Sequence, residues 1–557
     1  MYHTHIADTI FHGGRIFTWP WLESRPSALA VRSGRVLAVG PDDEMRDFQG
    51  GKTETVNCAG KLIIPGFQDA HIHPVMAGCV LSSCYLLDVS GRRATLDAIA
   101  EYRSHLAQGL WLRGWGWKQE DFPAGEPDRF LLDGITGPVP AYLTRADGHA
   151  AWANSSALQA SGITDSTPDP SGGRLERDAH GHVTGVLHEA AMKLVQQAMP
   201  PYTTDELVEA LRRSQSHLFS LGITGWQDAS VEGDELRAYK ALASSGELKA
   251  HVTGALRWDQ NRGVEQIADL EERRQRYENS NLDLHTVKIM VDGVIEGSRT
   301  AALIDPYLDP VSGNPTDNRG QTFLTKKGLE DAVSALTGRG FQLHFHAIGD
   351  RAVHYALDAL QHAYIEHGSQ VHHPVISHIQ LIDRRDIPRF SQLGAVASMQ
   401  PFWAAHDSTQ DGMTIPYIGL DRAEHEYPFR DLCEAHTIMA GGSDWMISSA
   451  YPIDGIHVAV NRKHYIKGST FKPSALQVVP QALYIKNAIT LAQGMTAYTY
   501  GTAVANSRQQ ITGRIAPGYN ADFTILDSDP FLHQDDEIGS TGVYATYING
   551  TPVYSNQ

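Results

Sequence analysis

Cysteine, long hydrophobic runs and positive charge are all scarce in this sequence. Its 557 residues include four cysteines, none in a CxxC pair, which excludes a disulfide framework. No run of about 18 apolar residues occurs, so no membrane-spanning helix is expected. The N-terminus has no basic segment followed by an apolar one, so no secretory signal is expected. The net charge of -18 argues against nucleic acid or an anionic membrane as the main partner. We expect a cytoplasmic protein that acts on a small-molecule substrate, with formation of a homodimer left open.

The composition is that of a globular protein, with 42% hydrophobic and 20% charged residues. The length predicts two or three domains. Both ends of the chain alternate apolar and polar residues, and near the N-terminus a Ser33-Gly34 turn lies between two valines, which is typical of a hairpin. The ends predict one small β-sandwich domain from residues 1–62 and 505–557. Within it, we expect the hairpin and the strand near residues 523–526 to share a sheet.

The middle of the sequence, residues 63–504, alternates short apolar runs with helical patterns, which is typical of a parallel α/β fold. Eight apolar runs are candidate strands: Leu62–Ile72, Ile223–Asp228, Ala250–Arg257, Thr286–Asp292, Gln342–His346, Val375–Ile379, Ala395–Gln400 and Ile438–Ser443. Eight strands with helical connections favour a (β/α)8 TIM-type barrel over an open sheet.

A long insertion separates the first two candidate strands. We expect residues 85–205 to form an inserted α/β domain, because no other connection approaches this length. An insertion after the first barrel strand emerges at the C-terminal face, where such barrels keep their active sites. The insertion is therefore a candidate substrate lid or wall over the mouth. Its tryptophans fit an aromatic substrate and also an ordinary core, so a self-contained structural domain is the alternative.

Metal-competent residues end several of the candidate strands. His71 and His73 close the first, and residues i and i+2 of a strand point to the same side. Alone, this pair also fits a solvated strand face. Four other strands carry or precede such residues, namely Lys288, His346, His378 and Asp444. Histidines and carboxylates that converge on one barrel mouth suit zinc or a similar divalent ion.

The order of these motifs resembles the amidohydrolase superfamily, in particular its branch of YtcJ-like and N-substituted formamide deformylase-like proteins. The motifs span nearly the whole chain: Pro65–Pro74, Asp147–Ser155, Pro170–Gly173, Asp292–Ala302, His346–Ala352, Met399–Pro401, Gly442–Trp445 and Pro517–Asp522. The resemblance implies a site for one or two metal ions, with these ligands: His71, His73, His346, His378 and Asp444.

Lys288 matches a position at which relatives carry a bridging ligand, often a carboxylated lysine. An ammonium group does not bind a cation, whereas a carbamate formed from a neutral, partly desolvated lysine offers two oxygens. The alternative is an unmodified Lys288 paired with Asp292 or Glu296, which leaves one metal.

The resemblance also indicates residues near the substrate, Trp117 and His149 in the inserted domain. Arg299 is a candidate to orient an oxyanion or a carboxylate. For these three residues the alternative is a structural contact. His344 points to the same side as His346, so it is a candidate ligand, a partner of a ligand or a substrate contact.

The predicted function is metal-dependent hydrolysis of a C–N bond in an amide, a formamide or an N-acyl compound. The ion lowers the pKa of bound water and polarises the carbonyl, and Asp444 acts as general base and then general acid. If Asp444 instead caps a helix after the eighth strand, it has no such role. The alternatives on the same site are a deaminase, a non-hydrolytic lyase or decarboxylase, and a metal-binding scaffold without turnover. Zinc is favoured, and manganese and iron stay open.

Overall fold

The computed structural model describes residues 6–18, 26–122, 127–146, 148–368, 372–465 and 481–556. These residues divide into two compact units. The first holds the described residues up to Pro74 and from Gln215 onward, and the second holds those of Val75–Ser214. No helix in the described ranges combines the length and the apolar character needed to span a membrane.

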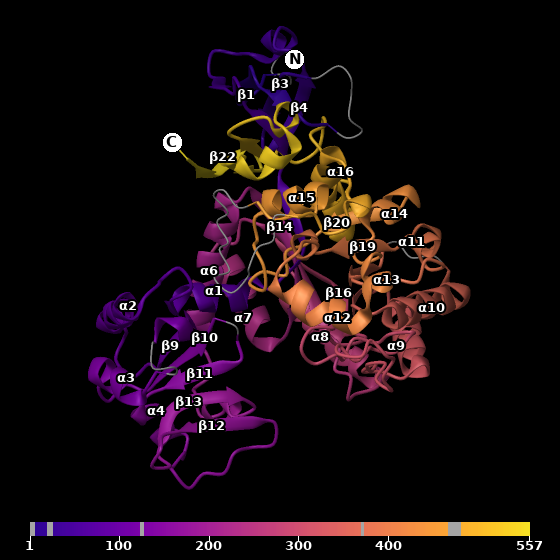
Figure 1. Ribbon diagram of the computed structural model, residues 1–557. Coiled ribbons are helices and arrows are strands. Elements are labelled where there is room, and N and C mark those ends of the chain that lie inside the picture. Colours follow the sequence, from indigo (N-terminus) through magenta and orange to yellow (C-terminus); the bar gives the residue numbers. More distant parts are fainter. Residues whose placement is uncertain are drawn as a thin grey trace. The chain divides into compact units, whose positions relative to one another are not determined.

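Eight parallel strands form the sheet at the centre of the first unit (Figure 1). They are β7 (Phe67–Ile72), β14 (Ile223–Val231), β15 (His251–Arg257), β16 (Leu282–Met290), β17 (Gln342–Ala347), β18 (Val375–His378), β19 (Val396–Met399) and β20 (Ile438–Gly441). Each pairs with the next along the chain. Beyond β20, the amide of Asp444 donates to the carbonyl of His71 at 2.7 Å, and the amide of His73 donates to the carbonyl of Trp445 at 3.1 Å. The sheet therefore nearly closes, and the predicted (β/α)8 barrel is confirmed.

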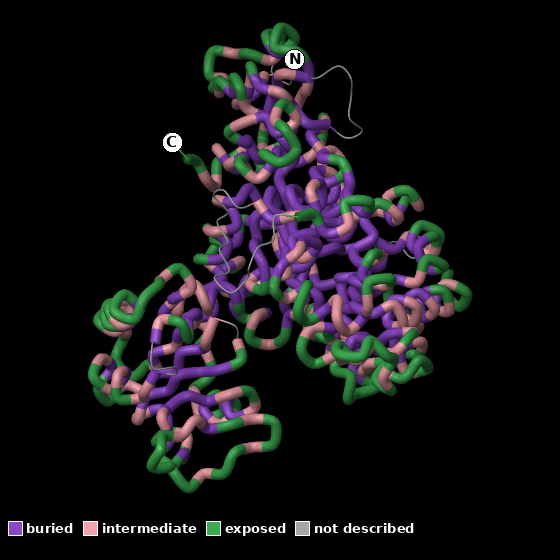
Figure 2. Tube along the Cα trace, viewed as in Figure 1, coloured by how far each residue is buried: buried purple, intermediate pink, exposed green. Residues whose placement is uncertain are grey.

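Helices follow the barrel strands along the chain. They are α6 (Thr204–Ser220), α7 (Gly233–Ser244), α8 (Ile267–Tyr277), α9 (Lys326–Gly338), α10 (Asp350–His367), α11 (Ile387–Leu393), α12 (Ile415–Ile418), α13 (Leu420–Ala423), α14 (Phe429–Glu434), α15 (Pro452–Asn461), α16 (Leu491–Thr496) and α17 (Thr502–Ala505). In α10, Val353, Leu357 and Leu360 recur three or four residues apart and form one buried face. Buried residues follow the barrel strands, and exposed residues follow the outer helices and loops (Figure 2).

The first candidate strand is in fact two strands that belong to different sheets. β6 (Leu62–Pro65) lies in the sandwich, and β7 begins after Gly66. The prediction of one continuous strand is wrong because the chain turns at this glycine, whose amide donates to the carbonyl of Asp522. A Cβ at position 66 would lie 2.4 Å from the side chain of Thr224. Only glycine therefore lets the backbone pass this closely.

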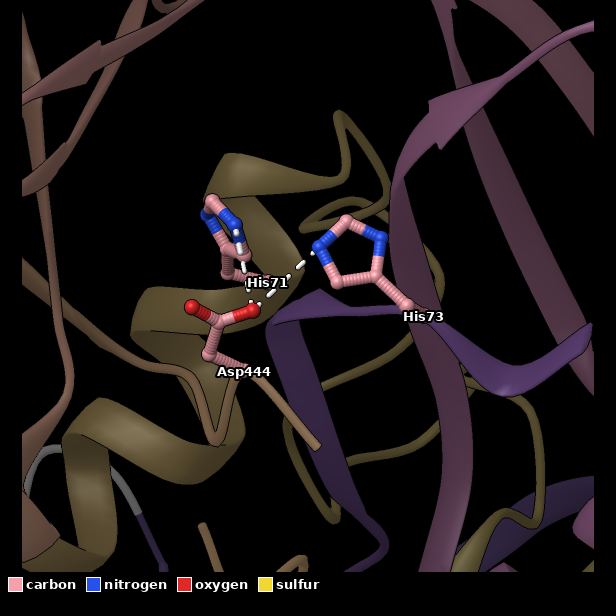
Figure 3. A group of neighbouring side chains, drawn as sticks. All are labelled: His71, His73 and Asp444. Atoms are coloured by element: carbon pink, nitrogen blue, oxygen red, sulfur yellow. Dashed lines mark ion pairs between the residues drawn. The ribbon is translucent and has the colours of Figure 1, made fainter. Parts of the chain in front are cut away.

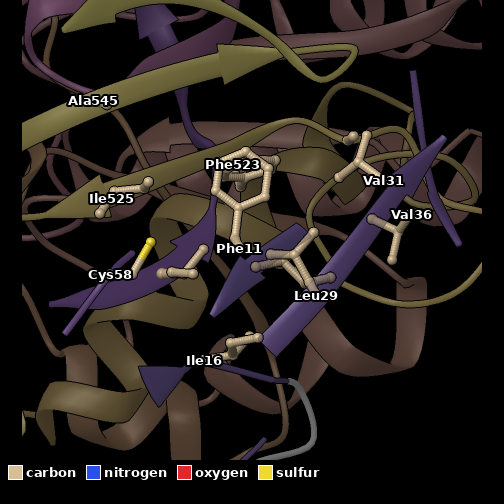
Figure 4. Close-up of a cluster of buried hydrophobic side chains, with 12 residues drawn as sticks. Phe11, Ile16, Leu29, Val31, Val36, Cys58, Phe523, Ile525 and Ala545 are labelled. Atoms are coloured by element: carbon tan, nitrogen blue, oxygen red, sulfur yellow. The ribbon is translucent and has the colours of Figure 1, made fainter. Parts of the chain in front are cut away.

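The two chain ends build two sheets around one apolar core. One sheet has the order β4 (Arg35–Gly40), β3 (Ala28–Arg32), β1 (Thr9–His12) and β5 (Glu54–Asn57). The other has the order β2 (Arg15–Ile16), β6, β21 (Phe523–Leu526), β22 (Val543–Ile548) and β23 (Thr551–Ser555). Phe11 and Leu29 from the first sheet share the core with Phe523 and Ile525 from the second (Figure 4). The predicted sandwich from both ends is confirmed.

The predicted hairpin is present, but its sheet was assigned wrongly. β3 and β4 flank a turn in which Ser33 (φ 48°) and Gly34 (φ 76°) are both left-handed. β21 lies in the other sheet, where its neighbours are β6 and β22. Both edges of β3 are already taken by β1 and β4. The hairpin contacts β21 through side chains such as Val31 in the shared core, and its backbone bonds instead to residues 518–521, which precede β21.

The second unit contains a six-stranded mixed sheet. Its order is β12 (Gly173–Arg177), β13 (Val183–Glu189), β11 (Ala150–Ala153), β10 (Ala141–Arg145), β9 (Leu112–Trp117) and β8 (Cys84–Tyr85). Its helices are α1 (Pro74–Ser82), α2 (Arg92–His105), α3 (Arg129–Thr136), α4 (Ser155–Ala160) and α5 (Met192–Gln196). Trp117 and Trp152 lie in its core, so the insertion is an α/β domain with a hydrophobic interior of its own. Asp147, from the motif at residues 147–155, lies outside the described residues.

Candidate metal centre

Two histidines and an aspartate meet at the C-terminal end of the barrel strands (Figure 3). His71 belongs to β7, and His73 follows directly after that strand. Oδ1 of Asp444 lies 3.2 Å from Nε2 of His73 and 3.8 Å from Nε2 of His71. One ligand atom from each of the three residues lies within 4.8 Å of the others, and within the described part of the chain no other trio of His, Cys, Asp or Glu does so.

The backbone around Asp444 is held in an uncommon conformation. Its φ of 53° is left-handed, which non-glycine residues rarely adopt and which clusters at functional sites. Two residues earlier, a Cβ on Gly442 would lie 2.9 Å from Cβ of His71, so glycine permits the close approach of this segment to β7. The next helix, α15, begins only at Pro452. The alternative role of Asp444 as a helix cap is therefore not found.

Lys288, on β16, is buried beside His71. Its Nζ lies 3.5 Å from Nε2 of His71, and the residue is 3% exposed. Burial lowers the pKa of its ammonium group to about 7, against an opposing effect of the Asp444 charge. Among the described residues no carboxylate forms an ion pair with Lys288. Asp292 instead accepts hydrogen bonds from three backbone amides, and Glu296 accepts from two polar side chains. The alternative pairing of Lys288 with either is therefore not found.

His346 and His378 continue the group of imidazoles across the mouth. The ring centroid of His378 lies 4.7 Å from that of His71 and 4.5 Å from that of His346. His378 donates from Nδ1 to Oε1 of Gln400 at 2.8 Å, which leaves Nε2 with a lone pair. His346 donates from Nε2 to the carbonyl of Gly293 at 3.1 Å, which leaves Nδ1 with a lone pair.

Burial keeps most of these imidazoles neutral. It lowers the pKa of His71 and His378 well below the usual value and that of His346 to about 4. His73 differs. Burial lowers its pKa, but the hydrogen bond to Asp444 and the nearby carboxylates more than offset this effect, so the pKa is raised. The neutral imidazole is the form that binds a metal.

His344 lies behind His71. Its Nε2 is 2.6 Å from Oγ of Ser377 and 3.1 Å from Nδ1 of His71, and its Nδ1 bonds to the side-chain oxygen of Gln227. The side chain of His344 has no exposed surface, and its contact with substrate stays a prediction. It occupies the position of a partner of a ligand, which was one of the roles left open.

Asp228, on β14, faces the other side of His73. Its Oδ1 lies 3.9 Å from Nδ1 of His73, and its Oδ2 accepts a hydrogen bond from Tyr239 at 2.9 Å. Sequence reasoning missed Asp228, Ser377 and Gln400. The available signal was a polar side chain at the C-terminal end of an otherwise apolar barrel strand.

The remaining predicted substrate contacts lie in different environments. Trp117 has no exposed surface, and its Nε1 donates to the carbonyl of Leu143 inside the second unit, so its contact with substrate also stays a prediction. His149 forms an ion pair with Glu189 at 2.9 Å, and both side chains are more than half exposed. The guanidinium of Arg299 lies over the ring of Tyr417, 4.8 Å from its centroid. Contact of His149 or Arg299 with substrate stays a prediction.

The donor set fits a divalent cation. Two imidazole nitrogens and one carboxylate oxygen approach one another within 4.8 Å, and this mixture of nitrogen and oxygen ligands is one that zinc accepts. His346 and His378 are neutral neighbours with lone pairs available. His344 lies at hydrogen-bond distance from the outer nitrogen of His71, as partners of metal-binding histidines do, and the Asp228 carboxylate lies 3.9 Å from that of His73.

Known proteins are similar to this chain in both sequence and fold. Residues 54–554 match the Amidohydrolase family. The putative amidohydrolase YtcJ of Bacillus subtilis is 31% identical over 562 residues, which cover 98% of this chain and 99% of the relative. N-substituted formamide deformylase of Arthrobacter pascens is 25% identical, with 99% of each chain covered. The crystal structure of an uncharacterized metal-dependent hydrolase from Pyrococcus furiosus matches with a TM-score of 0.74 and 25% identity, covering 94% of this chain and 99% of that one.

Proposed function

Since this chain belongs to the amidohydrolase family, we propose that it hydrolyses the C–N bond of an amide, a formamide or an N-acyl compound with a divalent cation as cofactor. The convergence of His71, His73 and Asp444 at the barrel mouth carries the proposal. The full-length similarity to N-substituted formamide deformylase supports the choice of a C–N bond. The similarity to a metal-dependent hydrolase supports the choice of a metal.

Zinc is the proposed cation, because histidine nitrogen and carboxylate oxygen are its usual ligands. His71 and His73 would hold it together with Asp444, and His346 and His378 would complete one or two sites. When bound, such an ion lowers the pKa of a water ligand toward neutrality and polarises a carbonyl group.

Asp444 is the proposed general base and general acid. Its carboxylate would take the proton of the water that attacks the carbonyl carbon, and would then give that proton to the leaving nitrogen. The side chain is 14% exposed, so it keeps access to the mouth. The hydrogen bond from its amide to the carbonyl of His71 fixes the backbone beside the ligands, so little reorganisation is needed when the proton moves.

Lys288 is proposed to carry a carboxyl group on Nζ. The neutral amine adds to the carbon of carbon dioxide and loses one proton, which gives a carbamate with two oxygen ligands and one negative charge. Its burial, its lowered pKa and its lack of a carboxylate partner among the described residues support this proposal. Protein exchanged in ¹³C-bicarbonate should show one carbamate carbon by NMR, and Lys288→Met should lack it.

The reaction is tested by product analysis. Zinc-loaded protein should convert a member of a panel of amides, N-substituted formamides and N-acyl amines into an amine and a carboxylic acid, with formic acid as the acid from a formamide. Release of ammonia from an amino-substituted ring would favour a deaminase instead. Stoichiometric metal with no turnover on either class of compound would contradict the proposal and favour a metal-binding scaffold.

A further inference from the structure

Strand β14 provides none of the proposed ligands, yet it carries two buried polar residues, Gln227 and Asp228. Gln227 has no exposed surface and bonds to His344, which in turn lies beside His71. We propose that Gln227 is a positioning residue, which acts through His344 and Ser377 to fix the tautomer of His71 that leaves Nε2 free for the metal.

The orientation of the Gln227 amide is fixed by its other contact. Its Nε2 donates to the carbonyl of Ala505 at 3.3 Å, and a carbonyl oxygen can only accept. The side-chain oxygen of Gln227 therefore faces His344. Since this oxygen also can only accept, Nδ1 of His344 must carry the hydrogen in the bond between them.

Nε2 of His344 then carries no hydrogen. A second proton would create a cation in a fully buried side chain, and no described carboxylate pairs with it to offset the loss of hydration. Nε2 of His344 therefore accepts, either from Oγ of Ser377 at 2.6 Å or from Nδ1 of His71 at 3.1 Å.

Both possibilities lead to the same form of His71. If Ser377 gives its hydroxyl hydrogen to His344, its oxygen accepts from Nδ1 of His71 at 2.9 Å. If His71 donates directly to His344, Nδ1 again carries the hydrogen. Nε2 of His71 then holds a lone pair and faces Lys288 and Asp444. The hydrogen-bond direction set at Gln227 thus reaches the metal ligand through His344, either directly or by way of Ser377.

This inference rests on the proposed metal site, not on the proposed reaction, so metal affinity is the appropriate measurement. Zinc affinity is measured by competition with a chromophoric chelator on metal-depleted, full-length protein. Gln227→Met removes the acceptor at similar volume and should weaken zinc binding about 10- to 100-fold, which is typical when the partner of a ligand is lost. Gln227→Glu, as the neutral carboxylic acid that burial favours, keeps a donor toward the carbonyl of Ala505 and an acceptor toward His344, and should bind zinc within about threefold of the unchanged protein.

Gln342 offers a matched control. It is also a buried barrel glutamine, and its Nε2 donates to the same carbonyl of Ala505, at 2.8 Å. Its oxygen accepts from Thr286, which leads away from His71. Its Nε2 also lies within reach of the carbonyl of His373 and Oγ of Ser507. Gln342→Met should therefore lose at least as many hydrogen bonds as Gln227→Met and keep its zinc affinity.

The outcomes separate this inference from the proposed function. Equal zinc affinity in Gln227→Met and the unchanged protein would overturn the inference. Equal losses of zinc affinity in Gln227→Met and Gln342→Met would also overturn it. So would a loss of zinc affinity in Gln227→Glu as large as that in Gln227→Met. If Gln227→Met does not fold, Gln227→Asn replaces it in the test. The shorter side chain moves the amide away from His344, so the same loss of zinc affinity is expected. Failure of the unchanged protein to bind zinc would instead remove the proposed metal site itself.

Discussion

The sandwich core and the metal centre each bring distant parts of the sequence together, but with different chemistry. In the sandwich, the rings of Phe11 and Phe523 are fully buried with centroids 4.8 Å apart. In the metal centre, His73 and Asp444 meet at 3.2 Å. Removing aromatic surface from water stabilises the fold, whereas removing imidazoles and carboxylates from water costs free energy. The metal centre thus depends on stability that apolar cores such as the sandwich provide.

This difference predicts that the two regions respond oppositely to substitution. A change in the metal centre should remove metal or activity with little loss of stability. A change in the sandwich should remove stability and leave zinc affinity unchanged in the protein that remains folded.

Asp444→Asn should have the largest effect. Asparagine keeps the shape of the side chain but cannot take a proton, so kcat on the amide substrate should fall at least about 100-fold, the lower end of the range for positioned proton transfer. The variant should fold and retain metal. Steady-state kinetics with elemental analysis checks this, and near-normal turnover would move the base elsewhere.

Phe523→Ala tests the other region. Its ring packs against Phe11 and stacks on Tyr547 with centroids 4.7 Å apart, and truncation of such a side chain costs about 3–5 kcal/mol. Chemical denaturation should show this loss, and the folded variant should bind zinc with unchanged affinity. A weakened zinc affinity would show that the two regions are coupled, which would contradict the expectation that they respond differently to substitution.

Acid should weaken the metal centre selectively. The raised pKa of His73 means that zinc must displace a proton once the pH falls below that pKa. Because zinc displaces one proton from His73, zinc affinity should fall by up to about tenfold for each pH unit below the pKa of His73. Above that pKa, zinc affinity should no longer depend on this proton. Chelator competition over a pH series measures the slope, and a flat profile would contradict the assignment of His73 as a ligand.

Thr325→Ala should have the smallest effect. Thr325 caps α9, its side chain accepts a hydrogen bond from the amide of Gly328, and loss of such a cap costs about 1 kcal/mol. The midpoint of denaturation should fall slightly, while zinc affinity and kcat stay unchanged. A change in kcat would mean that the periphery of the barrel controls its mouth.

Much of the fold followed from local pattern. Alternating apolar runs and helical segments predicted the barrel, because parallel strands buried on both faces require such runs. The pattern did not reveal the break at Gly66, since apolar residues continue across it into β7. Nor did it assign β21 to its sheet, because strand pairing depends on which edges remain free after the core has packed.

The site was predictable where strand geometry alone decides the outcome. His71 and His73 fall on one side of a strand, and Asp444 follows β20 at the same end of the barrel. The burial of Trp117 was not predictable, since tryptophan serves cores and binding sites alike. The proposed role of Gln227 was not predictable either, because it depends on His344 and Ser377, which belong to other strands.

The most direct test of the central claim is the metal content of His71→Ala. The account predicts that the unchanged protein retains at least one equivalent of zinc after dialysis. It also predicts that His71→Ala loses at least one equivalent, while its circular dichroism stays close to normal and its thermal unfolding stays close to that of the metal-depleted unchanged protein. His149→Ala removes an exposed histidine from the second unit and should keep its metal. Full zinc occupancy in folded His71→Ala, measured by elemental analysis, would contradict the assignment of the centre.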